Sequence, residues 1–198
     1  MRFLMITAAA LMTATSPAFA QDADTARQAT EAEARKDGPV GCIGGAVPRT
    51  VDRDVLTALV LKGFEAENNE EKSAYNAVSR AIANCRGRFG WGDARQAVAV
   101  NYFRGSTLRG NAAYKLRDYG VEWHYFIAAV EAMPQEDRDL LMNQGSISAA
   151  ALTAAIEAID AQGATLGAAE PDASQEIASA LAQGLAGTII VNQAIDAY

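Results

Sequence analysis

Apolar side chains recur along most of this chain at intervals of three and four residues, which is the spacing of one face of an α-helix. The segment 121–133 shows this spacing most clearly, with Trp123, Phe126, Ile127, Val130 and Met133. Strict alternation of apolar and polar residues, which would indicate a half-buried strand, is too rare to predict a single strand. The sequence therefore predicts an all-α protein.

Composition favours the same fold class. Alanine dominates the apolar residues, which make up 50% of the chain, and aromatic residues make up only 7%. Alanine costs no side-chain entropy in a helix and lets neighbouring helices approach closely. We expect residues 38–198 to form a single compact domain of about seven or eight helices, arranged as an orthogonal bundle or as a short array of helical repeats.

Glycine, proline and polar residues mark where the expected helices begin and end. Thr50 is positioned to cap one helix, and a second helix that starts near residue 70 is expected to stop at Gly87. Asp93 is the expected cap of a third helix, which ends before Gly105, where the chain restarts. Later boundaries are expected at Gly120, at Pro134, near residues 146 and 162, and at a capping box of Asp172 and Gln175 that opens a buried final helix.

The first twenty residues, MRFLMITAAALMTATSPAFA, have the parts of an export signal. Arg2 supplies a positive charge, an uncharged apolar stretch follows over 3–14, and the small residues Ala18 and Ala20 flank Phe19 before the expected cleavage site. The apolar stretch is shorter than the roughly 20 residues that span a bilayer. We therefore expect a periplasmic or secreted protein without a transmembrane segment after cleavage, and a polar segment at 21–37 that forms a flexible leader or a frayed helix.

Cys42 and Cys85 are the only cysteines in the chain. An oxidising compartment favours a disulfide between them, which would tie the glycine-rich segment around Cys42 to the end of a helix. Two free buried thiols are the alternative. Two cysteines and a single histidine, without a C-x-x-C pair, predict no structural zinc site, and the sequence predicts no other metal and no cofactor.

Charge is distributed unevenly along the chain. Residues 80–117 contain eight arginine and lysine residues against one acidic residue, Asp93, whereas residues 118–198 contain twelve acidic residues against Arg138. Arginine binds carboxylates and phosphates through its planar fork of N–H groups, and neighbouring aromatic rings can stack on a ligand. The residues predicted to bind an anionic partner in this way are Arg86, Arg88, Trp91, Arg104 and Arg109.

A second interpretation is that the basic helices pack beside the acidic C-terminal half, so that the two regions neutralise each other. Under the first interpretation the partner is an acidic periplasmic protein or an anionic component of the cell envelope. Nucleic acid is disfavoured by the expected compartment and by the net charge of −7.

Motifs for catalysis are missing from the sequence. There is no G-x-S-x-G, S-x-x-K or H-E-x-x-H, and the segment G-C-I-G-G lacks the lysine of a phosphate-binding loop. His124 has no nucleophile motif beside it, so we interpret it as a structural histidine at the edge of a helix. The densest acidic group, Glu65, Glu67, Glu70 and Glu71, is interpreted as a solvated surface rather than a catalytic pair.

Residues 103–136 resemble a single tetratricopeptide repeat, whose period is 34 residues. Gly110, Asp118-Tyr119, Phe126, Ala129 and Pro134 match the positions of that pattern. The positions that depart from it are Ser106, Arg109, Ala113 and Glu122. The sequence shows no second copy, although such repeats bury a continuous core only in arrays. The resemblance implies a helical scaffold that binds protein.

These observations together predict an exported, non-catalytic helical protein that binds or interacts with an anionic partner. A periplasmic helical enzyme that acts on a cell-wall or other anionic substrate is the first alternative. A carrier for a small apolar ligand is the second. Two converging carboxylates in a cleft would favour the enzyme, and a closed apolar cavity would favour the carrier.

Overall fold

Short turns join α-helices throughout the described part of the chain, which is residues 38–168 and 174–198 of a computed structural model. The expected signal peptide and polar leader at 1–37, and Asp172 of the expected capping box, lie outside these ranges. The described residues contain the helices α2 (Cys42–Ala46), α3 (Arg53–Leu61), α4 (Asn69–Phe89), α5 (Asp93–Lys115), α6 (Tyr125–Ala132), α7 (Gln135–Gln144), α8 (Ala149–Asp160) and α9 (Ser174–Ala197), with 3-10 turns η1 (Arg117–Tyr119) and η2 (Leu166–Ala168). The prediction of an all-helical domain is confirmed.

Three predicted helix boundaries in the first half are wrong. Gly92 is the N-cap of α5, and Asp93, the predicted cap, is the first residue of the helix. Asp52, not Thr50, caps α3, because its carboxylate accepts hydrogen bonds from the backbone N–H groups of Asp54 and Val55. Helix α4 continues through Gly87, where a Cβ would meet no other atom, and ends at Gly90, whose φ of 66° is left-handed. The glycine that stops the helix is therefore the one that has to adopt a positive φ.

Helix α5 is also longer than predicted, because the chain does not break at Gly105. Gly105 lies where α5 packs against α9, and a Cβ built on Gly105 would come within 2.6 Å of the carbonyl oxygen of Gly187. A Cβ on Gly187 would lie equally close, 2.6 Å, to the Gly105 oxygen. These two glycines let the helix backbones touch, and the conformational cost of a mid-helix glycine is offset by that packing.

The tetratricopeptide-like segment 103–136 does not form the extended helix pair of such a repeat. Its first part belongs to the long helix α5, and its second part contains only the short helix α6. Helix α6 packs mainly against α8 and α9 rather than along α5. Trp123, expected on the buried face of this segment, precedes the helix and is 51% exposed.

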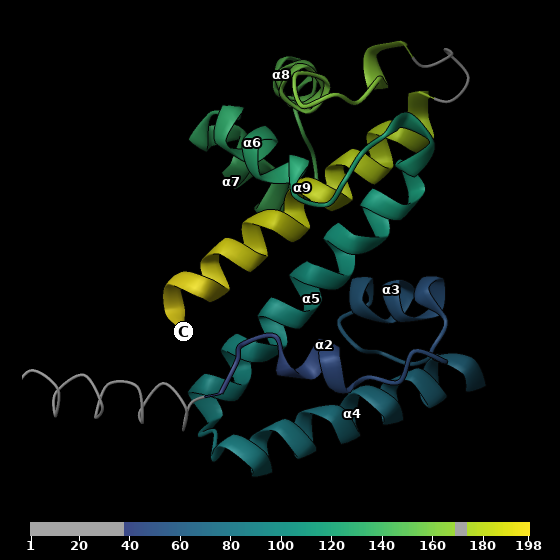
Figure 1. Ribbon diagram of the computed structural model, residues 1–198, viewed down its shortest axis with the longest axis vertical. Helices are drawn as coiled ribbons and strands as arrows, with labels where there is room; N and C mark the ends of the chain where they lie inside the picture. The colour runs from purple at the N-terminus through teal and green to yellow at the C-terminus, as the bar shows by residue number, and fades with distance from the viewer. Residues whose placement is uncertain (1–37, 169–173) are drawn as a thin grey trace, which may run out of the picture. The chain divides into compact units, whose positions relative to one another are not determined.

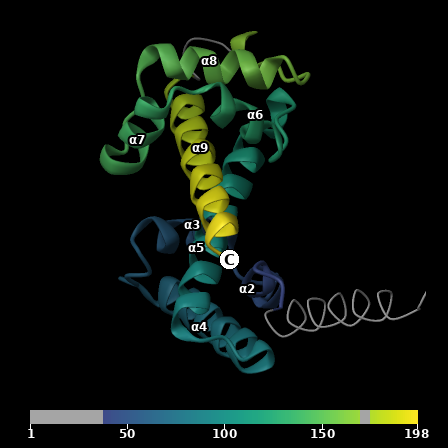
Figure 2. The same ribbon diagram turned by 90° about the vertical axis from the view of Figure 1, so that its left-hand side faces the viewer.

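Two clusters of buried apolar side chains form the interior of the described domain. The N-terminal core joins α2, α3, α4 and the first part of α5, and it consists of Ile43, Val60, Val78, Ala81, Cys85, Trp91, Ala99, Phe103 and Leu108. The C-terminal core is larger and joins the end of α5 with α6, α7, α8 and α9. Figures 1 and 2 show α2, α3 and α4 around one end of α5, and α6, α7 and α8 around the other end.

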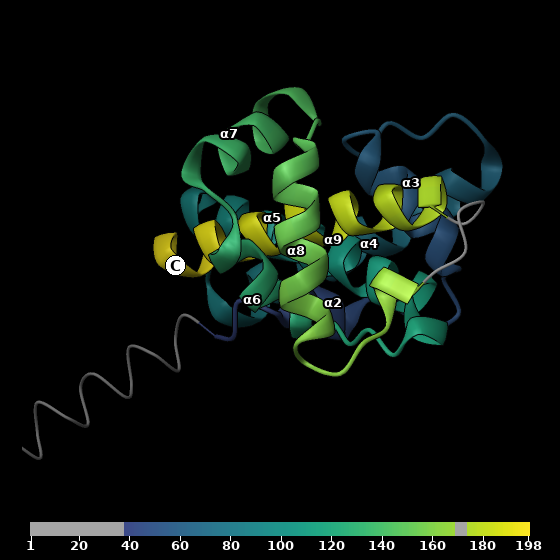
Figure 3. The same cartoon turned by 90° about the horizontal axis from the view of Figure 1, so that it is seen from above.

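Helix α9 is the central helix of the C-terminal core, in agreement with its predicted burial. Leu181 and Leu185 are fully buried, and Phe126 of α6 lies directly against Gly184. Seen from above, α8 crosses over α9 and α5 (Figure 3). Ser148 caps α8 by accepting a hydrogen bond from the backbone N–H of Ala151.

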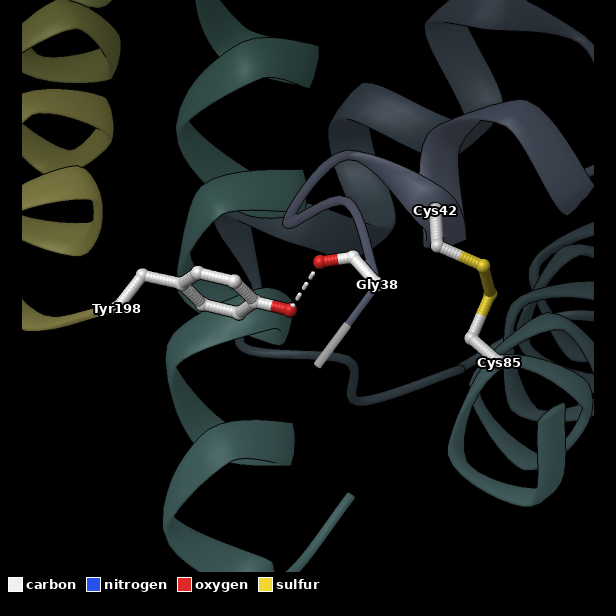
Figure 4. The surroundings of a disulfide bond; sticks show 4 residues. All are labelled: Gly38, Cys42, Cys85 and Tyr198. Carbon is white, nitrogen blue, oxygen red and sulfur yellow. Dashed lines mark hydrogen bonds between the residues drawn. A yellow bond between two sulfur atoms is a disulfide. The ribbon is translucent and has the colours of Figure 1, made fainter. Parts of the chain in front are cut away.

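Covalent and polar contacts tie the N-terminal core together. Cys42, at the start of α2, and Cys85 of α4 form a disulfide with Cα atoms 6.1 Å apart (Figure 4). The segment expected to be an irregular loop thus contains a short helix held to α4. The Tyr198 hydroxyl donates a hydrogen bond of 2.8 Å to the Gly38 carbonyl (Figure 4), and Arg95 donates to the Tyr198 carbonyl.

Candidate functional site

The predicted anion-binding residues Arg86 and Arg88 lie near the C-terminal end of α4, where both are exposed. Arg86 forms an ion pair of 2.9 Å with Asp93 and a hydrogen bond of 3.0 Å with Gln96, so part of its guanidinium is already engaged. The Arg88 guanidinium lies 5.2 Å from the ring centre of Phe89. These two arginines form an exposed cationic end of α4, one side of which is neutralised by Asp93.

Trp91 and Arg104 lie elsewhere. Trp91 is only 3% exposed and stacks on Phe89 inside the N-terminal core, so its ring is a core residue. Arg104 lines a cleft between α5, α7 and α9, and its Nε is buried without a hydrogen-bond partner among the described residues. The residues that the sequence suggested as one surface are therefore placed in separate parts of the domain.

Contacts between the basic stretch and the acidic C-terminal half are found within residues 80–168 and 174–198, which the structure describes. An ion pair that crosses this boundary joins the sequence neighbours Arg117 and Asp118, at 3.5 Å, and Arg95 of the basic stretch contacts the ring and carbonyl of Tyr198. The pair between Arg86 and Asp93 stays within the basic stretch. The positive charges near the end of α5 are instead placed against aromatic rings.

Tyr114, near the C-terminal end of α5, lies between two arginines. The Arg53 guanidinium is 4.0 Å from the centre of its ring, and the Arg117 guanidinium is 4.3 Å from it. We call these three residues the Tyr114 group. Arg53 begins α3, and Arg117 begins η1, so the fold brings together residues from three elements. The Tyr114 side chain and, to a smaller extent, Asp118 raise the pKa of the Arg117 guanidinium above its ordinary value.

Arg117 also pairs with Asp118, at 3.5 Å, so Arg53 is the less engaged of the two arginines. An arginine that packs a flat face on an aromatic ring keeps its N–H groups in the plane of the guanidinium, where they can bind an anion. Tyr114 itself is 45% exposed. No carboxylate in the described part of the chain pairs with Arg53. The Tyr114 group therefore presents two cations on an exposed aromatic ring.

Arg109, the remaining predicted residue, makes a similar contact on a different face of α5. Its side chain is buried to 8% exposure, and its guanidinium lies 4.6 Å from the ring centre of the exposed Trp123. Burial lowers the pKa of Arg109, whereas nearby Tyr102 raises it. Within residues 38–168 and 174–198 Arg109 forms no ion pair, so Trp123 is the group that covers its charge.

A cleft of about 340 Å³ opens between α3, the segment before it, and α5. We call it the α3–α5 cleft. Its lining is cationic, polar and apolar without an acidic side chain, and consists of Gly44, Val47, Pro48, Arg49, Val51, Arg53, Leu56, Phe103, Ser106, Thr107, Gly110 and Asn111. Because Arg53 belongs both to the cleft and to the Tyr114 group, the two features are continuous.

Asn111 is the unusual residue of this cleft. It lies inside α5, is only 2% exposed, and its Oδ1 atom has no hydrogen-bond partner among the described residues. Buried polar side chains are almost always hydrogen-bonded, because an unpaired buried acceptor costs about 1–3 kcal/mol. An unpaired acceptor in the wall of a cleft is a group that a bound molecule can satisfy.

Other titratable groups have structural partners. His124 is exposed, lies 3.3 Å from a carboxylate oxygen of Glu122, and contacts the ring of Tyr125 edge-on. Glu71 is buried and bonded at 2.8 Å to Lys62, which also pairs with Glu67. The described ranges hold no group of three or more His, Cys, Asp or Glu side chains placed to bind a metal ion.

Four clefts lined by described residues bear on the two alternative functions, and one of about 360 Å³ has two carboxylates in its lining, those of Asp139 and Asp196. Each of these clefts contains at least one charged side chain, which differs from the closed apolar cavity of a carrier. A cleft of about 470 Å³ contains Asp52 and Glu70, but the Asp52 carboxylate is already used to cap α3.

Comparisons with known protein families, with curated proteins and with solved structures find no match to this chain. In the residues that the structure describes, no helix combines the length and the apolar content needed to cross a membrane.

Sequence reasoning did not single out Arg53, Asn111, Tyr114 or Arg117 as members of a site, and the residue it did single out nearby, Arg109, lies against Trp123 instead. Arg53 lies outside the basic stretch, in a segment of mixed charge. The negative charges of its neighbours Asp52 and Asp54 cancel its positive charge in a count of local net charge. Asn111 carries no signal in sequence, because its burial depends on how α3 packs against α5. The only available clue was the aromatic residue Tyr114 among the basic residues of 80–117.

Proposed function

We propose that this chain is an exported, non-catalytic binding protein that engages an anionic partner through the Tyr114 group. The observation that supports this most strongly is the placement of Arg53 and Arg117 on the exposed ring of Tyr114, at 4.0 and 4.3 Å. Two cations held on one ring repel each other, and although Arg117 is paired with Asp118, Arg53 is left to attract a further anion.

The proposed partner is an acidic periplasmic protein or an anionic component of the cell envelope. The export signal expected in residues 1–20 supports this compartment, and so does the disulfide between Cys42 and Cys85. The net charge of the whole chain is −7. An anionic partner is therefore attracted by the local cationic site and repelled by the rest of the protein surface, so that it meets the protein in one orientation.

Retention on an isolated cell-envelope fraction tests this proposal with a matched pair of variants. Protein produced from the full sequence is compared with Arg53→Gln/Arg117→Gln and with Arg86→Gln/Arg88→Gln, each of which removes two positive charges. We expect retention of the natural sequence at low salt, loss of retention at about 0.5 M salt, where the Debye length falls to about 4 Å, and a strong reduction only in Arg53→Gln/Arg117→Gln.

Circular dichroism and thermal unfolding of the two variants serve as controls for folding. The proposal is wrong if both variants are retained like the natural protein, or if Arg86→Gln/Arg88→Gln is the one that loses binding. Turnover of an envelope substrate by the purified protein would instead favour the periplasmic enzyme.

A further inference from the structure

We infer that the α3–α5 cleft binds the carboxyl end of a peptide. This inference rests on the proposed function, because Arg53 is shared between the cleft and the Tyr114 group. A peptide's carboxyl end combines three features within a few atoms, namely a carboxylate, the N–H of the last amide bond, and a side chain. The cleft offers a complementary group for each of them.

The carboxylate is matched by two arginines at the cleft. Arg49 is exposed on the segment before α3, and Arg53 begins α3 with its flat face on Tyr114. No ion pair of Arg53 is found among the described residues, and a planar fork of N–H groups pairs well with a carboxylate. No acidic side chain lines the cleft to compete for them.

The amide N–H is matched by Asn111. Its Oδ1 is a hydrogen-bond acceptor, is buried, and has no donor among the described residues. An acceptor of this kind is satisfied by an N–H or O–H group of a ligand, and not by the oxygen atoms of an anion. The ligand therefore has to carry a hydrogen-bond donor as well as its negative charge.

The side chain is matched by the apolar part of the cleft. Val47, Leu56 and Phe103 are half-buried or buried and line it together with Gly110, which leaves room beside the α5 backbone. A volume of about 340 Å³ is at the small end of ligand sites, which suits one or two residues rather than a long segment. Apolar walls beside the arginines favour a peptide end over a sugar phosphate, whose surface is polar on all sides.

Titration of short peptides, followed by calorimetry, tests this inference. The probes are N-acetyl-D-alanyl-D-alanine, which has the carboxyl end of a cell-wall stem peptide, and N-acetyl-L-alanyl-L-alanine, which has that of a protein. The amidated form of each peptide lacks the charge. We expect saturable binding of at least one acid and about tenfold or greater weakening on amidation, the size typical of losing a charge-assisted hydrogen bond.

Three variants locate the binding. Arg53→Gln should weaken it by about tenfold, and Asn111→Leu, which is close in volume but cannot accept a hydrogen bond, by about fivefold. Arg80→Gln is the matched control, because Arg80 lines a different cleft and its loss changes the net charge equally. Binding to this control should equal binding to the natural sequence. Circular dichroism establishes that Asn111→Leu is folded, and Arg53→Gln tests the inference independently of that variant.

A preference for the D peptide assigns the ligand to the cell wall, and a preference for the L peptide assigns it to a protein carboxyl end. Absence of saturable binding for both acids, equal binding of acids and amides, or binding that Arg53→Gln leaves unchanged would overturn the inference. If the peptides fail while envelope retention still depends on Arg117, only the cleft assignment is lost and the proposed function stands.

Discussion

The two cores of this domain are stabilised in different ways. The N-terminal core is small, contains the aromatic residues Trp91 and Phe103, and is cross-linked by the disulfide between Cys42 and Cys85. The C-terminal core is larger and has no disulfide, and its central helix α9 closely approaches α5 at Gly187 and Gly105. A small core gains most from a covalent link, whereas a larger one gains from dense packing.

Helix α5 connects the two regions. Leu108 is its last residue in the N-terminal core, and Ala112 is its first in the C-terminal core. Asn111 lies between them and is the buried polar residue of the α3–α5 cleft. The α3–α5 cleft is therefore located at the boundary between the two cores, beside the single uninterrupted helix α5.

The largest expected effect comes from removing the disulfide. For a pair of cysteines 43 residues apart, the loop-entropy estimate is about 4 kcal/mol of stabilisation, as an upper value. Cys42→Ala/Cys85→Ala should lower the urea midpoint and, in amide hydrogen exchange, reduce protection in α2, α3 and α4 before α6, α8 and α9. An equal loss of protection in both regions would contradict the view that the disulfide serves the N-terminal core.

A second effect distinguishes two glycines that have the same secondary structure. Gly187→Ala places a Cβ against the Gly105 carbonyl oxygen, and the resulting overpacking should destabilise the protein by about 1–3 kcal/mol. Gly87→Ala adds the same methyl group to α4 where nothing is nearby, so it should stabilise by about 0.5–1 kcal/mol. Urea unfolding measures both, and effects of the same sign would contradict the role assigned to the crossing.

A smaller and pH-dependent effect is expected from Glu71, at the start of α4. Its hydrogen bonds with the Lys62 ammonium and the Glu67 backbone N–H lower its pKa below the ordinary 4.5. A carboxylate with a lowered pKa stabilises the folded state above its unfolded pKa, and this contribution is lost as the pH falls through the folded value. The stability difference between natural protein and Glu71→Gln should therefore be largest near pH 7 and shrink below pH 4.5.

The exposed Glu65 provides the control for that measurement, because no hydrogen bond or ion pair of its side chain is found among the described residues. Glu65→Gln should unfold at nearly the same urea concentration as the natural protein at each pH. A difference for Glu71→Gln that stays constant from pH 7 to pH 3 would show that the ion pair with Lys62 contributes nothing to stability.

Periodicity in the sequence was sufficient to predict the helices but not where glycine interrupts them. Gly87 and Gly105 look alike in sequence to Gly90 and Gly120, yet only the latter two adopt a positive φ and end an element. Whether Gly105 breaks a helix depends on α9, about eighty residues later in the chain, because the crossing itself requires a residue without a Cβ.

The candidate site was harder to predict for a related reason. The sequence pointed to the basic stretch 80–117, and the structure uses Tyr114 and Arg117 from it, but Arg53 arrives from α3 through tertiary packing. Trp91 was counted with the arginines because of its position between them, although its ring is needed in the N-terminal core. Local charge and aromatic content do not show which side chains face solvent.

The central claim is that anions bind at the Tyr114 group rather than at the cationic end of α4. Two-dimensional NMR of the ¹⁵N-labelled protein, titrated with short poly-L-glutamate at low salt, tests it most directly. We predict that the largest amide shifts fall on Arg53, Tyr114 and Arg117, and that they disappear at about 0.5 M salt as charges are screened. Largest shifts at Arg86 and Arg88, or shifts spread evenly over the domain, would contradict the claim.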